Sequence, residues 1–171
     1  DYDYAWESRW IRDEGYAAIL GTALKDGLAK LGVDGSSVTH AIIAVPVKGV
    51  PEQLAKRAGL NPDACVDPMM AIVGDSGAAH PLLMLAATLE TAKPGDTILL
   101  ASFGQGADVL LFEVTDAITR LPARRGVAGH LAFRAEDGNY SRYLFHRGLH
   151  SLDKGMRAEM DQKQPGTTLF R

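Results

Sequence analysis

The chain has 171 residues, of which 18 are Lys or Arg and 21 are Asp or Glu, so its formal net charge is −3 at pH 7. This length suits one domain with a sizeable core, and 46% hydrophobic and 23% charged residues are typical of a globular protein. The slightly negative net charge does not favour a nucleic-acid partner. No apolar run reaches the ~18 residues of a membrane span. A single cysteine, Cys65, excludes an internal disulfide and a cysteine metal cluster, so we expect a cytoplasmic protein without a metal.

The first half of the chain predicts a helix, a strand and a second helix. Residues 12–32 place apolar side chains at helical spacing, with acidic residues in the first turn and a glycine at the end. Residues 38–47, VTHAIIAVPV, are small or β-branched and apolar, which predicts a strand buried on both faces. Residues 51–59 begin with proline and end with glycine, which indicates a short helix.

The next segment predicts a long helix followed by a β-hairpin. Residues 78–92 are apolar on almost all sides, so we expect this helix to be buried in the middle of a layered fold. Two strand-like runs follow at residues 97–103 and 107–114. The order of helix, strand, helix, helix, strand and strand predicts an α/β layer that ends in a hairpin.

The charge changes sign along the chain. Residues 1–115 carry 8 Lys and Arg against 15 Asp and Glu, whereas residues 116–171 carry 10 against 6. We therefore divide the chain into a domain at 1–115 and a basic, extended or helical appendage at 116–171 that packs on a partner. Because the sequence does not begin with Met, we also expect it to be a fragment of a longer protein.

The loop between the two hairpin strands is the first candidate site. It reads Gly104, Gln105, Gly106, and bare backbone N–H groups of such a loop can converge on a developing oxyanion. The alternative interpretation is a tight hairpin with a bulge.

The segment VGDSGAA, residues 73–79, is the second candidate. Asp75 or Ser76 can cap the helix that follows. Alternatively, Asp75 faces the same cavity as the glycine loop and orients a water or accepts a proton. His80 is expected to bond to backbone or water at the helix start. The chain shows no Ser-His-Asp pattern and no paired carboxylates, so it offers no complete catalytic set of its own.

The stretches at residues 39–60 (THAIIAVPVKGVPEQLAKRAGL) and 73–114 (VGDSGAAHPLLMLAATLETAKPGDTILLASFGQGADVLLFEV) carry a family resemblance. They resemble the C-terminal half of the thiolase superfamily, in its 3-oxoacyl-acyl-carrier-protein synthase III and hydroxymethylglutaryl-CoA synthase branch. The resemblance covers residues 1–115 and implies an α/β fold: one layered half, a mixed five-stranded sheet with helices on its faces, followed by the C-terminal appendage. The active site of such proteins lies between two halves.

The resemblance also implies roles for particular residues. Gly104, Gln105 and Gly106 inherit the oxyanion-hole loop, with the Gln105 N–H as the donor. The nucleophilic cysteine of the family belongs to the N-terminal half, and Cys65 is not its counterpart. The positions expected to contact the substrate are Ala44, Val47, Ser76 and Phe103.

Three departures from the family pattern bear on the chemistry. The family's His-Gln-x-Asn falls on residues 44–47, so Ala44 takes the place of the histidine and Val47 that of the asparagine. The Gly-Asn-Thr of the family becomes a segment with Asp75, a carboxylate that would have to act as the base instead. True thiolases have a second cysteine where this chain has Leu100.

Three functions therefore stay open. The first is one half of an acyltransferase, or condensing enzyme, in lipid metabolism that acts on acyl-CoA or acyl-carrier-protein thioesters and needs no cofactor. The second is a non-catalytic subunit or scaffold that binds acyl-CoA, and the third is a retro-aldolase with Asp75 or a tyrosine as base. The expected partners are the N-terminal thiolase half, a second copy in a homodimer, and an OB-fold and zinc-ribbon module that follows the tail.

Overall fold

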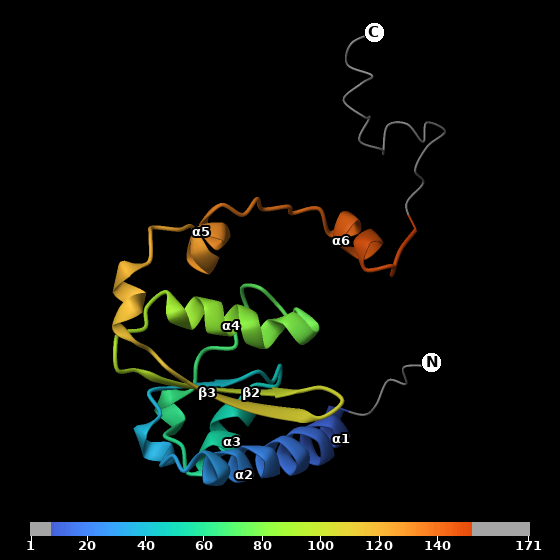
Figure 1. Ribbon diagram of the computed structural model, residues 1–171. Helices are drawn as coiled ribbons and strands as arrows, with labels where there is room; N and C mark the ends of the chain where they lie inside the picture. The colour runs from blue at the N-terminus through green and yellow to red at the C-terminus, as the bar shows by residue number, and fades with distance from the viewer. Residues whose placement is uncertain (1–7, 152–171) are drawn as a thin grey trace. The chain divides into compact units, whose positions relative to one another are not determined.

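The computed structural model describes residues 8–151 (Figure 1). The chain divides into two units, residues 1–133 and 134–171. The first unit carries the sheet and also includes η5 (Asp116–Arg120) and α5 (Gly126–Ala132), so it extends past the change in charge at residue 115. The described part of the second unit contains α6 (Tyr140–His146). In residues 8–151 no helix is both long enough and apolar enough to cross a membrane.

The described sheet has three strands in the order β1-β2-β3. β1 (His40–Ile43) runs parallel to β2 (Thr97–Phe103), which pairs antiparallel with β3 (Ala107–Glu113). The two predicted hairpin strands are therefore confirmed. A mixed α/β layer is also confirmed, because the parallel pair is joined through helices and the antiparallel pair through a short loop.

The expected five strands are not found among the described residues. The segment after α3 approaches the free side of β1 but makes only one parallel bridge there, between Ala41 and Cys65, with the Val66 N–H donating to the Ala41 carbonyl. Pro68 follows two residues later and has no N–H to donate, so the pairing does not continue past this point.

Helices cover both faces of the sheet (Figure 1). On one face lie α3 (Val50–Ala58) and a continuous helix made of α1 (Ser8–Trp10), η1 (Ile11–Leu20) and α2 (Gly21–Leu31). Leu24, Leu54 and Leu99 are among the buried residues of this main core. The other face carries α4 (His80–Leu89), which packs on Ile42 and Ile98 in a smaller cluster.

The expected burial of the apolar helix in the middle of a layered fold is seen only on its sheet-facing side within the described residues. Met84 and Thr88 on α4 face the sheet and are buried, whereas Leu82 is 62% exposed. On the same face of the sheet Leu110 and Phe112 of β3 are 47% and 37% exposed. Contacts with the described residues therefore explain the apolar residues on the sheet-facing side of α4 but not its exposed ones.

Candidate functional site

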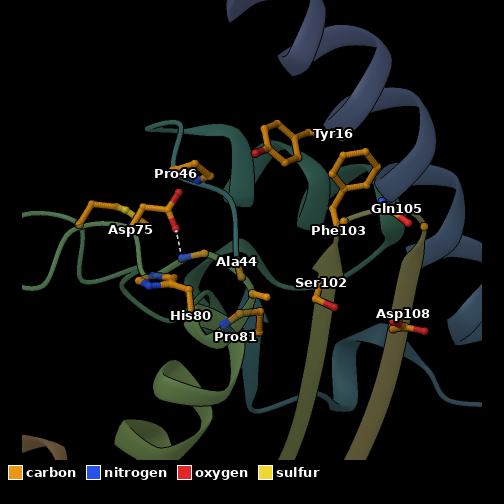
Figure 2. Close-up of a pocket in the computed structure, with 15 residues that line it drawn as sticks. Tyr16, Ala44, Pro46, Asp75, His80, Pro81, Ser102, Phe103, Gln105 and Asp108 are labelled. Carbon is orange, nitrogen blue, oxygen red and sulfur yellow. Dashed lines mark hydrogen bonds between the residues drawn. The ribbon is translucent and has the colours of Figure 1, made fainter. Parts of the chain in front are cut away.

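A cavity of about 640 Å³ lies where the parallel strands β1 and β2 end. This is the edge at which α/β sheets commonly bind ligands. Six of the eight residues singled out from the sequence line it: Ala44, Asp75, Phe103, Gly104, Gln105 and Gly106. The fold thus brings together three segments of the chain whose residues lie between 28 and 62 positions apart (Figure 2).

The glycine loop joins β2 to β3 and forms one side of the cavity. The Gly104 N–H donates to the Gly106 carbonyl at 2.8 Å, so this amide is already used. For the Gln105 N–H, no backbone acceptor is found within residues 8–151. The backbone N–H groups of Gln105 and its neighbour Gly106 are therefore the remaining candidates for the oxyanion donor.

The two loop glycines are not explained by local structure. Neither has a positive φ, and a Cβ added at Gly104 or Gly106 would meet no atom within 4 Å. Backbone conformation and packing within the described chain would thus accept a larger residue at both positions. The open space beside them instead permits close approach of another molecule to the backbone.

Asp75 and Ser76 occupy the entry to α4 and behave differently. Asp75 Oδ1 accepts the Gly77 N–H at 2.8 Å while the carboxylate stays exposed and lines the cavity. Capping of a loop amide and a place in the cavity are therefore compatible for this residue. Ser76 is exposed, does not line the cavity, and places its Oγ 3.0 Å from His80 Nδ1.

His80 is a structural histidine in this arrangement. It is only 2% exposed, and its Nε2 lies 2.8 Å from the Pro68 carbonyl oxygen. Because a carbonyl only accepts, Nε2 carries the hydrogen and Nδ1 accepts from Ser76. Both ring nitrogens are satisfied, in line with the expected backbone bond at the helix start, and neither is available to a ligand.

Ala44 and Val47, which take the places of the family's histidine and asparagine, point to different surroundings after the end of β1. The chain turns at Ala44, where the Val45 N–H folds back to the Ile43 carbonyl at 2.8 Å, and the Ala44 methyl group lines the cavity. The turn ends the predicted strand 38–47 early. Val47 packs partly buried against the main core and does not line the cavity.

Tyr16 is a cavity residue that the sequence analysis missed. It lies on η1, and its ring meets Phe103 edge-on, with centroids 5.5 Å apart. Burial and the negative charge of Asp75 raise the pKa of the Tyr16 phenol, so the hydroxyl stays protonated at neutral pH. In the sequence Tyr16 is a single aromatic residue beside two alanines near the start of the predicted helix 12–32, and its position there gives no sign of a cavity.

Cys65 lies outside the cavity and has an unreactive thiol. Burial, with a smaller effect of the negative charge of Glu52, raises its pKa to about 11. A thiol with this pKa is protonated at neutral pH and is a poor nucleophile. Among residues 8–151 no group of three or more His, Cys, Asp or Glu side chains is placed to hold a metal ion.

Comparisons with known proteins show the family to which the chain belongs. The family described as "3-Oxoacyl-[acyl-carrier-protein (ACP)] synthase III C terminal" matches residues 28–110, which include β1, β2 and the glycine loop. The chain carries the C-terminal region of a thiolase-superfamily protein. Its resemblance to the 3-oxoacyl-acyl-carrier-protein synthase III and hydroxymethylglutaryl-CoA synthase branch is thereby confirmed.

Two of the curated relatives are hydroxymethylglutaryl-CoA synthases. A hydroxymethylglutaryl-CoA synthase of Methanosarcina mazei is 31% identical over 144 residues, which are 82% of this chain and 41% of the relative. A protein of the same name from Archaeoglobus fulgidus is 33% identical over 129 residues, 74% of this chain and 37% of the relative. The chain thus spans about two fifths of the length of these thiolase-superfamily relatives.

Proposed function

We propose that this chain forms one wall of a thioester-binding site in a thiolase-like acyltransferase that acts on acyl-CoA or acyl-carrier-protein substrates. The observation that carries the proposal is the Gln105 backbone N–H, which has no backbone acceptor among the described residues and belongs to a loop that lines the cavity. A backbone donor held in a fixed loop stabilises negative charge on a carbonyl oxygen without having to reorganise. In this account the loop binds and polarises the thioester carbonyl.

The remaining chemistry is divided between this wall and the rest of the protein. Ala44 ends β1 with a methyl group, which can neither accept nor donate a proton. We assign the role of acid–base group to Asp75, whose second carboxylate oxygen is not used when Oδ1 accepts from the Gly77 N–H. We propose that the nucleophile comes from an N-terminal thiolase half, which also covers the exposed apolar face of α4 and β3.

A non-catalytic subunit that binds acyl-CoA is the second candidate. Ala44 and Leu100 favour it, because they take the places of the family's histidine and of a thiolase cysteine, and Leu100 is buried at 2% exposure. Such a subunit would keep the glycine loop and lose turnover. A retro-aldolase with Asp75 as base is a variant of the first candidate in which the bond broken lies within the acyl group.

The proposal is tested by carbonyl-dependent binding in the protein as its gene encodes it. Calorimetric titration with acetyl-CoA and with S-ethyl-CoA, a thioether that lacks only the carbonyl oxygen, should show about tenfold tighter binding of the thioester. Equal affinity for the two ligands would refute the proposed role of the loop.

Turnover then separates the two candidates. The acyltransferase is supported if the unaltered protein releases free CoA from acyl-CoA substrates and the Asp75→Asn variant does not. Thioester binding without turnover in the unaltered protein supports the non-catalytic subunit.

A further inference from the structure

Few side chains of the cavity can donate a hydrogen bond to a ligand. Asp75 and Asp108 are carboxylates, which only accept when ionised, and both nitrogens of His80 are already bonded. The neutral side-chain donors that line the cavity are the hydroxyls of Tyr16 and Ser102 and the amide of Gln105. They differ in how firmly the fold holds them.

Tyr16 is held in place from two sides. It lies in η1, a stretch of wide helical turns between Ile11 and Leu20, and such turns are frequent at functional sites. Its ring packs against Phe103 at an interplanar angle of 67°, and Phe103 ends the strand that leads into the glycine loop. The phenol is therefore fixed relative to the same loop that presents the Gln105 N–H.

Ser102 is less suited to this role. It stands opposite Asp108 in the β2–β3 register, and Figure 2 shows its hydroxyl on the side of β3. A carboxylate across the strand pair is a strong competitor for a hydroxyl proton. The Tyr16 hydroxyl, by contrast, has no hydrogen-bond partner within residues 8–151.

The Tyr16 hydroxyl and Gln105 serve different parts of the cavity. In Figure 2 the hydroxyl points toward Pro46 and Asp75, whereas Gln105 lies on the far side of Phe103. The electrostatic effect of Asp75 on Tyr16 agrees with this placement. One ligand that reaches both ends must therefore offer a second polar group besides its thioester carbonyl.

The pair formed by Tyr16 and Asp75 defines the kind of group. A protonated phenol donates a hydrogen bond, and an ionised carboxylate accepts one. An alcohol on the acyl chain can do both at once, since its oxygen accepts from Tyr16 while its hydrogen is donated to Asp75. A ketone oxygen has no hydrogen to donate, and its partial negative charge would face the carboxylate.

We propose that Tyr16 and Asp75 together bind a hydroxyl group on the acyl chain, so that the cavity selects hydroxyacyl thioesters. This inference rests on the proposed binding of the thioester carbonyl at the glycine loop. Tyr16 is then a specificity-determining residue that acts together with Asp75 on the same hydroxyl group.

Calorimetric titration of the protein as its gene encodes it tests the inference, with 3-hydroxybutyryl-CoA, butyryl-CoA and acetoacetyl-CoA as ligands. We expect 3-hydroxybutyryl-CoA to bind about tenfold more tightly than either of the others. The Tyr16→Phe variant keeps the ring on Phe103 and should lose this preference while its affinity for butyryl-CoA stays unchanged. The Ser102→Ala variant removes the other hydroxyl and should keep the preference.

The outcomes separate this inference from the proposed function. Preference for acetyl-CoA over its thioether without preference for the hydroxyacyl ligand would overturn the hydroxyl site alone. A hydroxyl preference that survives in Tyr16→Phe, at an unchanged thermal unfolding midpoint, would overturn the role of Tyr16. Loss of the preference for acetyl-CoA over its thioether would overturn the proposed function and this inference together.

Discussion

Replacing Gln105 with proline is expected to weaken acetyl-CoA binding about tenfold while leaving S-ethyl-CoA binding unchanged. Proline lacks the backbone N–H, so the Gln105→Pro variant removes the proposed donor to the thioester carbonyl. A net contribution of about 1 to 1.5 kcal/mol for one hydrogen bond corresponds to this change in affinity. If the protein turns over acyl thioesters, the loss in kcat should be larger, about 10² to 10³, because the donor acts on developing charge.

The matched control is Gln105→Ala, which removes the side chain and keeps the N–H. It should bind both ligands as the unaltered protein does. Gln105 is exposed at the tip of the hairpin, so both variants should unfold at the same temperature as the parent. Equal weakening by alanine and proline would assign the effect to the side chain and contradict the backbone-donor account.

Replacing Gly35 with alanine is expected to destabilise the fold by about 1 to 3 kcal/mol. Gly35 is buried, and a Cβ at this position would lie 2.5 Å from the Gly59 carbonyl oxygen and 2.8 Å from its carbon. Both of those atoms belong to the backbone, so no side chain can rotate away. The turn before β1 and the end of α3 would have to separate, at the edge of the main core where Leu60 is buried.

The control for this variant is Gly104→Ala. A Cβ there meets nothing within 4 Å and the backbone φ is ordinary, so the free energy of unfolding should stay within about 0.5 kcal/mol of the parent. Urea unfolding followed by circular dichroism measures both. If Gly35→Ala were as stable as Gly104→Ala, the close contact between the two backbone segments would be wrong.

Local patterns predicted most of the fold. The hairpin strands and the helix that contains Pro51 lie close to their expected bounds, because apolar runs, proline and glycine act within a few residues. The burial of α4 could not be predicted in this way. An apolar sequence indicates that a helix needs packing partners on several sides. It does not indicate whether the described chain supplies all of these partners, and the exposure of Leu82 shows that the described residues do not.

The candidate site was predicted in part. The glycine loop and Asp75 were found because each has a local signal, a loop between strands and a residue before a helix. Tyr16 was missed, because its place in the cavity depends on how the first helix crosses the sheet onto Phe103, a contact between residues 87 positions apart in the sequence. Val47 was assigned by position in a motif, and the turn at Ala44 carries it into the core instead.

The central claim is that the bare amide of Gln105 meets a thioester carbonyl. The most direct measurement is the ¹H–¹⁵N spectrum of the assigned protein during titration with acetyl-CoA and, separately, with S-ethyl-CoA. The account predicts a downfield shift of the Gln105 amide proton with acetyl-CoA and no such shift with the thioether. A resonance that stays in place with both ligands, or moves equally with both, would contradict it.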